Sequence, residues 1–277
     1  MRLLTYSEAG GPARVGRLEG EEVVELAAGD MLDWLRGDGG EETGRRSPLA
    51  EVRLHAPVPE PPSLRDFYAF EGHVETGWRR RGGEIPEAWY EAPAFYFSNP
   101  ASIHGPGEEV KGPAGTSMLD FELEIAAVIG AGERIAGFTL LNDWSARDIQ
   151  RREMTVGLGP AKGKDFASSL GPWLVTVDEL PLSDGRLRIE AGVSVNGREL
   201  TRTDASAQHF SWEEIREHAA SQTRLRPGDV LGSGTLDRGC LLELGPLKVE
   251  GRERWLEPGD VVELWAEGLG SLRTPIV

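Results

Sequence analysis

The sequence contains one cysteine, Cys240, among its 277 residues. A single cysteine excludes an internal disulfide framework, a metal site built from several thiolates and a CxxC redox pair. The composition is therefore consistent with a reducing compartment. The first sixteen residues also lack a long apolar run and include Glu8, which is untypical of a secretory signal peptide. We expect a cytoplasmic protein.

Membrane-spanning segments and an excess of basic charge are missing as well. No stretch approaches the roughly 18 consecutive apolar residues of a transmembrane helix. Lys and Arg number 30 against 46 Asp and Glu, which gives a net charge of −16. Nucleic acids and anionic membranes bind basic surfaces, so neither is expected as the main partner.

Several common nucleotide-binding and hydrolase motifs are absent too. Residues 159–165, GPAKGKD, have three residues where a phosphate-binding loop has four, and Asp165 stands where that loop has Ser or Thr. The chain has no GxGxxG, HExxH or GxSxG motif. Dinucleotide binding, zinc-protease chemistry and serine acyl transfer therefore lose their usual sequence support.

Glycine and proline divide the chain into two predicted domains. Residues 1–56 are predicted to form a small β-rich N-terminal domain, with a helix over 31–36 capped by Asp30 and a polar loop over 37–48. Four prolines within 57–63 predict a stiff, extended connector. Residues 64–277 then form the second domain.

The second domain is predicted to mix strands with a few helices. We expect helices over 64–81, with Ser63 as its N-cap, and over 144–153. Strands are expected over 121–129 and 137–141, together with a hairpin that turns at Asn196 and Gly197. These elements indicate a β-rich α+β fold.

The segment DFELE at 120–124 places three carboxylates on alternate residues. Side chains alternate across a strand, so Asp120, Glu122 and Glu124 share one face. Three like charges repel one another unless a cation or water separates them. A hard divalent cation prefers such an oxygen set, but a solvated acidic sheet face has the same pattern.

Other polar residues are spaced in ways that have two interpretations. Asp66 and His73 lie seven residues apart and would share one face of the predicted helix. Asp143 ends an apolar strand, where ligands commonly bind, although it also fits a helix N-cap. Glu243 follows small and apolar residues, and an exposed strand position is its simpler interpretation.

Five stretches, taken in order, resemble the fumarylacetoacetate hydrolase family. The most specific is NDWSARDIQ at 142–150. The others are DFYAFEGH at 66–73, FELE at 121–124, GKDF at 163–166 and GDVLGSGT at 228–235. The resemblance covers about residues 64–245, and residues 1–60 only fit the small N-terminal β domain of many members. It implies a mixed β-roll of stacked sheets with flanking helices, and a homodimer.

The resemblance also implies roles for individual residues. The expected metal ligands are Asp66, Glu122, Glu124 and Asp143, a choice that leaves out Asp120. The expected cofactor is Mg²⁺, Mn²⁺ or Ca²⁺. The expected catalytic residues are His73, Glu243, Arg147, Gln150 and Lys164, and the expected substrate contacts are Tyr68, Arg81, Met154 and Thr235.

The activity implied is metal-dependent hydrolysis of a carbon–carbon bond in an oxo-acid such as an acylpyruvate or fumarylacetoacetate. Met154 stands where fumarylacetoacetase has a tyrosine that contacts substrate, so the substrate is expected to differ. A decarboxylase or tautomerase of oxo-acids or hydroxy-dienedioates is the main alternative. A non-enzymatic protein that binds a small molecule is a more distant one.

Overall fold

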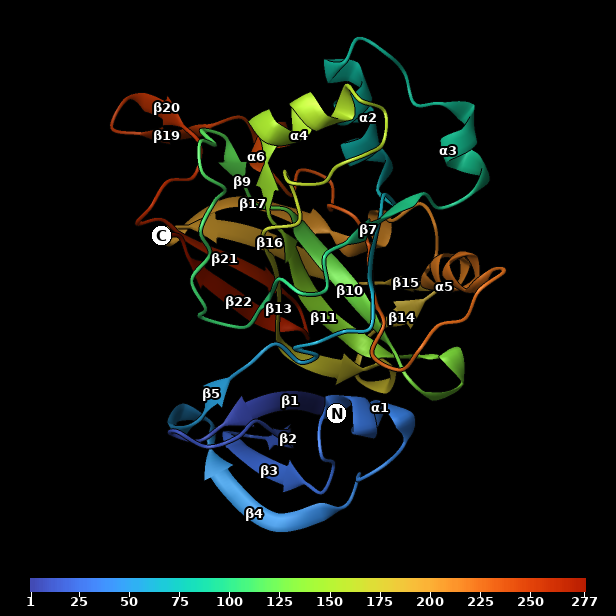
Figure 1. Cartoon of the computed structure of the whole chain (residues 1–277), viewed down its shortest axis with the longest axis vertical. Coiled ribbons are helices and arrows are strands. Elements are labelled where there is room, and N and C mark those ends of the chain that lie inside the picture. Colours follow the sequence, from blue (N-terminus) through green and yellow to red (C-terminus); the bar gives the residue numbers. More distant parts are fainter.

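Two β-sheets packed face to face form the framework of the molecule in a computed structural model, which describes all 277 residues (Figure 1). The larger sheet has twelve strands and the smaller sheet has four. Six α-helices lie outside the sheets. The predicted mixed, strand-rich α+β fold is confirmed.

The larger sheet has the strand order β4, β3, β2, β1, β13, β11, β10, β18, β6, β7, with β5 paired to β1 and β8 paired to β13. Only the pairs β6–β18 and β8–β13 are parallel. The strands are β1 (Arg2–Ser7), β2 (Arg14–Glu19), β3 (Glu22–Leu26), β4 (Glu42–Pro48), β5 (Arg53–Leu54), β6 (Leu64–Phe67), β7 (Phe95–Ser98), β8 (Ile103–His104), β10 (Leu123–Ile129), β11 (Ile135–Asp143), β13 (Ser168–Thr176) and β18 (Val230–Gly232).

The smaller sheet has the order β17, β16, β21, β22. The remaining strands form three two-stranded ribbons. The strands of the smaller sheet are β16 (Glu190–Val195), β17 (Arg198–Asp204), β21 (Val261–Ala266) and β22 (Gly270–Pro275). The ribbons pair β9 (Leu119–Asp120) with β12 (Ser145–Ala146), β14 (Leu182–Ser183) with β15 (Arg186–Leu187), and β19 (Leu247–Val249) with β20 (Arg252–Arg254). The helices are α1 (Met31–Arg36), α2 (Glu71–Arg80), α3 (Glu87–Glu91), α4 (Arg147–Met154), α5 (Trp212–Ala220) and α6 (Leu241–Leu244).

Several predicted elements are confirmed. Helix α1 has the expected bounds, and the Asp30 carboxylate accepts the Asp33 N–H at 2.8 Å. Strands β16 and β17 turn at Asn196 and Gly197, which have φ values of 52° and 76°. Positive φ at both positions is what a two-residue type I′ turn requires. None of the six helices is both long and apolar enough to cross a lipid bilayer.

The predicted helix over 64–81 is wrong in its first half. Residues Leu64–Phe67 form the buried strand β6, and the helix α2 begins only at Glu71. The Ser63 hydroxyl donates to Asp229 at 2.7 Å instead of capping a helix. The four residues LRDF are too few to distinguish a strand from a helix by their apolar pattern, and here pairing with β7 and β18 decides between them.

Two other predicted boundaries are also wrong. Residues expected as a loop over 37–48 include strand β4, an edge strand whose charged side chains form ion pairs with β2, Glu42 with Arg17 and Arg46 with Glu19. Its side chains are mostly exposed, so it has no apolar alternation to reveal it. The helix expected over 144–153 begins at Arg147, after the short strand β12.

The two faces of the larger sheet pack against different partners. Along β10, Ile125 and Ala127 belong to the core shared with the smaller sheet. Ala126 and Val128 point to the other face and pack with N-terminal residues such as Leu3. The N-terminal strands also continue the sheet itself, because β1 pairs with β13. Three acidic residues of the candidate site lie on this second face.

Candidate active site and metal centre

Three carboxylates, Asp66, Glu124 and Asp143, have oxygen atoms that all lie within 4.8 Å of one another. They come from β6, β10 and β11, which lie within one run of the larger sheet. Each lies two residues from a core residue of the face that packs on the N-terminal unit: Asp66 from Leu64, Glu124 from Ala126 and Asp143 from Leu141. Strand alternation therefore brings the three carboxylates to one face.

Gly232 on β18 provides the space in which these carboxylates meet. It pairs with Asp66 on one side and with Ala126 on the other. A Cβ placed on Gly232 would lie 2.6 Å from Asp66 Oδ1 and 3.0 Å from Glu124 Oε2. The sequence drew attention to the GSG segment, but it did not show that one glycine lies between two acids.

The carboxylate cluster fits a hard divalent cation. Asp66 Oδ1, Asp143 Oδ1 and both Glu124 oxygens are buried and accept no hydrogen bond from the protein. Burial raises the pKa values of Asp66 and Glu124 well above the usual range, and repulsion from neighbouring carboxylates raises them further. Buried oxygens without donors are the ligand type that Mg²⁺, Mn²⁺ and Ca²⁺ prefer.

Glu122, the fourth predicted ligand, is joined to this cluster through Lys164. The Lys164 ammonium group contacts both the Glu122 carboxylate and Asp143. Glu122 Oε1 also lies 2.7 Å from Arg147 Nη2. Burial by itself would raise the pKa of Glu122, but the charges of Arg147 and Lys164 outweigh it and lower that pKa. Its place as a metal ligand stays a prediction.

Asp120, which the resemblance set aside as a ligand, has a different position. Its carboxylate accepts a hydrogen bond from Arg147 Nε at 2.8 Å. It also accepts the N–H groups of Leu241 and Leu242 at 2.8 and 3.0 Å, where α6 begins. Asp120 therefore fixes Arg147 and the helix that carries Glu243, and Arg147 Nη1 donates onward to Gln150 at 3.2 Å.

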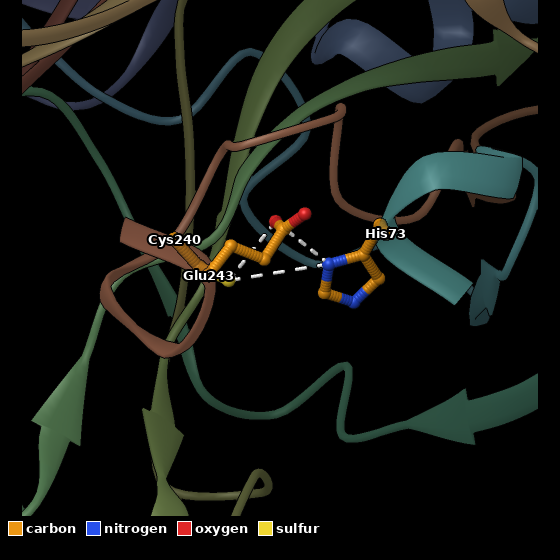
Figure 2. Close-up of side chains that lie close together, drawn as sticks. All are labelled: His73, Cys240 and Glu243. Atoms are coloured by element: carbon orange, nitrogen blue, oxygen red, sulfur yellow. Dashed lines mark hydrogen bonds and ion pairs between the residues drawn. The ribbon is translucent and has the colours of Figure 1, made fainter. Parts of the chain in front are cut away.

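His73 and Glu243 form a sheltered pair, shown in Figure 2 with Cys240 beside it. His73 Nδ1 lies 2.9 Å from Glu243 Oε2, and the two side chains are 9% and 5% exposed. Glu243 belongs to α6, so its interpretation as an exposed strand position is wrong. Burial would raise the pKa of Glu243, but hydrogen bonds led by that from His73 lower it. The backbone N–H of His73 donates to Asp237 at 3.0 Å.

The four predicted substrate contacts lie at different depths. Thr235 is buried, and the Tyr68 ring meets the His73 ring edge to face at a centroid distance of 5.5 Å. Arg81 is the C-cap of α2, and its guanidinium lies 4.8 Å from the Trp78 ring centre. Met154 ends α4 and is 40% exposed. Helices α2 and α4 lie together at the end of the molecule opposite β1–β4 (Figure 1).

The sequence analysis missed Tyr96, whose hydroxyl donates to Asp143 Oδ2 at 2.5 Å. Tyr96 lies on β7 directly opposite Asp66 in the strand register. Its segment, FYFS, reads as an ordinary aromatic strand, so no local signal distinguishes it. Asp143 meets Tyr96 and Lys164, whereas the N-cap of α4 is Ala146, so the N-cap interpretation of Asp143 is wrong.

Comparison with known proteins gives matches over both parts of the chain. Residues 63–277 match the family model described as Fumarylacetoacetate (FAA) hydrolase C-terminal, and residues 1–57 match that described as Rv2993c-like, N-terminal. Fumarylacetoacetase of Arabidopsis thaliana is 32% identical over 71% of this chain. The aligned region spans only 63% of that longer protein.

Two other similar proteins align over nearly the whole chain. Oxaloacetate tautomerase YisK of Bacillus subtilis is 30% identical, and the alignment covers 93% of this chain and 84% of that protein. The crystal structure of 5-carboxymethyl-2-hydroxymuconate delta-isomerase from Mycobacterium smegmatis has a TM-score of 0.75 and 30% identity. It covers 100% of this chain and 99% of its own.

Replacing Gly232 with alanine should weaken divalent-metal binding while the fold is kept. The added methyl group would occupy the space between Asp66 and Glu124, so we expect the dissociation constant for Mg²⁺ or Mn²⁺ to rise about 10–100-fold. Isothermal titration calorimetry would measure it, with circular dichroism to check folding. Gly40→Ala, with open space around the added Cβ, is the control. Unchanged Mg²⁺ affinity in Gly232→Ala would show that metal binding does not need the space between Asp66 and Glu124.

Replacing Asp120 with alanine should destabilise the protein by about 3–5 kcal/mol, the usual cost of breaking a buried ion pair. Arg147 and the N–H groups of Leu241 and Leu242 would lose the acceptor that they share. Urea unfolding would measure the loss. Glu253→Ala, which removes one side of an exposed pair with Lys248, should change stability by less than about 1 kcal/mol. Equal effects of the two substitutions would refute the anchoring role.

The raised pKa values of Asp66 and Glu124 predict that metal binding releases protons. Above the ordinary carboxyl pKa of about 4, the metal-free folded protein holds more protons than the unfolded chain. These extra protons stabilise the folded state, so the free energy of unfolding of the metal-free protein falls as the pH rises through the raised pKa values. A bound cation keeps the carboxylates ionised and offsets that loss.

Two measurements test this dependence. Calorimetric Mg²⁺ titrations in buffers of different ionisation enthalpy should reveal proton release, and affinity should increase with pH. Thermal unfolding of the metal-free protein should depend less on pH in Glu124→Gln, which cannot ionise at that position. Metal binding without proton release would show that both carboxyls are already ionised.

Proposed function

The chain belongs to the fumarylacetoacetate hydrolase family, and we propose that it is a metal-dependent hydrolase that cleaves a carbon–carbon bond in a β-diketo acid. The observation that carries this proposal is the His73–Glu243 pair at 2.9 Å. A water molecule needs such a base before it can attack a carbonyl carbon, whereas tautomerisation needs no activated water. An acylpyruvate or a related compound is the substrate class proposed.

The carboxylates Asp66, Glu124 and Asp143, with Glu122 as the fourth predicted ligand, would hold the metal. A hard divalent cation bound there would supply Lewis-acid polarisation of the substrate's oxygen atoms and would orient the substrate. Mg²⁺ is the ion proposed. The buried oxygens without donors support this assignment.

His73 acts as the general base in this proposal. A carboxylate only accepts hydrogen bonds, so Glu243 holds the proton of His73 on Nδ1 and leaves Nε2 free. Nε2 takes a proton from water, and the resulting hydroxide attacks a carbonyl carbon of the substrate. When the carbon–carbon bond breaks, the leaving enolate takes up the proton that His73 holds.

Arg147, Gln150 and Lys164 supply hydrogen-bond donors and positive charge around the developing alkoxide. Arg147 and Lys164 are buried, so their charges act with little screening by water. One well-placed donor of this kind typically contributes about 2.7–4 kcal/mol to the transition state. Tyr68, Arg81, Met154 and Thr235 are proposed to contact the remainder of the substrate.

A second candidate function is tautomerisation, isomerisation or decarboxylation of an oxo-acid. The tautomerase and isomerase that align over nearly the whole chain favour it, because they share both parts of this protein. Those reactions need an enolisable acid and the metal, but they need no activated water. His73 therefore separates the two candidates.

The test compares acetylpyruvate, fumarylacetoacetate and oxaloacetate with Mg²⁺ and with chelator. We expect loss of enol ultraviolet absorbance and formation of both cleavage products from a β-diketo acid, checked by chromatography. His73→Ala should lower kcat by about 10²–10⁴, because it removes a general base. Glu75→Ala, an exposed position on the same helix, is the control. Oxaloacetate turnover that survives His73→Ala, without cleavage of either diketo acid, would favour the second candidate.

A further inference from the structure

Cys240 brings a sulfur atom to the His73–Glu243 pair. Its Sγ lies 3.3 Å from Glu243 Oε2 and 4.0 Å from His73 Nδ1, and the latter two atoms are 2.9 Å apart. Figure 2 shows the three side chains converging from α2 and from the start of α6. One nitrogen, one sulfur and one oxygen donor therefore form a compact triangle.

This donor set differs in kind from the all-oxygen cluster of Asp66, Glu124 and Asp143. Imidazole, thiolate and carboxylate are the ligands that zinc binds, at bonds of about 2.0–2.3 Å. Tetrahedral geometry with such bonds sets the donors about 3.3–3.8 Å apart, and the three observed separations bracket that range. Hard cations such as Mg²⁺ avoid thiolate ligands.

We propose that His73, Cys240 and Glu243 form a second metal site, selective for thiophilic divalent cations such as Zn²⁺, and that zinc bound there inhibits the enzyme. The single proton of the neutral imidazole would move from Nδ1 to Nε2, which leaves the Nδ1 lone pair free to bind zinc, and the Cys240 thiol would release its proton to solvent. The imidazole stays neutral and carries its only proton on Nε2. Nε2 can no longer accept a proton from water.

The surrounding structure holds the donors in place before any metal arrives. Asp237 accepts the His73 N–H, and Asp120 accepts the N–H groups of Leu241 and Leu242 next to Cys240. Both backbone segments are therefore fixed by carboxylates from elsewhere in the chain. A preorganised site avoids the cost of ordering its ligands, which favours tight binding.

Cobalt spectroscopy tests the site without a substrate. Chelator-treated protein would be saturated with Mg²⁺ to fill the carboxylate cluster and then titrated with Co²⁺. We expect one Co²⁺ per chain with a near-ultraviolet thiolate-to-cobalt charge-transfer band, displaced by Zn²⁺. Cys240→Ser should lose the band but keep a hydroxyl that can donate to Glu243. Glu124→Gln, which changes only the carboxylate cluster, should keep it.

Zinc inhibition provides the second readout, and this part rests on the function proposed for His73. Excess Mg²⁺ should not relieve inhibition of the Mg²⁺-loaded protein by Zn²⁺. In Cys240→Ser the inhibition constant should rise at least about 10–100-fold, measured against that variant's own activity. Circular dichroism would confirm that the variant is folded.

Three results would overturn the proposal: no charge-transfer band, equal zinc sensitivity in Cys240→Ser, or relief by Mg²⁺. The last would place zinc in the carboxylate cluster. A thiolate band without inhibition would overturn the inhibitory half of the proposal and, with it, the role of His73 as base. Failure of the site and failure of the proposed function are thus distinguishable.

Discussion

Five buried side chains of alternating charge run through the site in the order Asp120, Arg147, Glu122, Lys164 and Asp143. Burying each charge by itself is costly, and the opposite charge of the neighbouring side chain offsets part of that cost. Asp66 and Glu124 add two more carboxylates at one end. With all five carboxyl groups ionised, five negative charges would face two positive ones, and a divalent cation would offset most of the excess.

The same row of charges connects the two parts of the candidate site, the carboxylate cluster and the His73–Glu243 pair. At one end, Asp143 meets the carboxylate cluster at the ends of β6, β10 and β11. At the other end, Asp120 holds the first residues of α6, which positions Glu243 against His73. The proposed base and the proposed metal ligands arise on separate elements and are in this way held by one set of ion pairs.

Much of this arrangement can be predicted from local sequence, but its three-dimensional assembly cannot. Period-two spacing predicted that Asp120, Glu122 and Glu124 share one face, and Arg147 does contact both Asp120 and Glu122. It could not decide which would meet Asp66, because that depends on β18 lying between β6 and β10. Tyr96 and Gly232 were missed for the same reason, as their importance comes from the strands beside them.

The pairing of β1 with β13 joins residues that are far apart in the sequence, since Leu3 lies opposite Leu174. A ribosome adds roughly 5–20 residues per second, so the first strand emerges about ten to thirty seconds before its partner. During that interval the edge of β1 that will bind β13 has open backbone groups, which makes it a site for mispairing with other chains. The order of synthesis therefore leaves the nascent chain exposed to aggregation until the middle of the protein has been made.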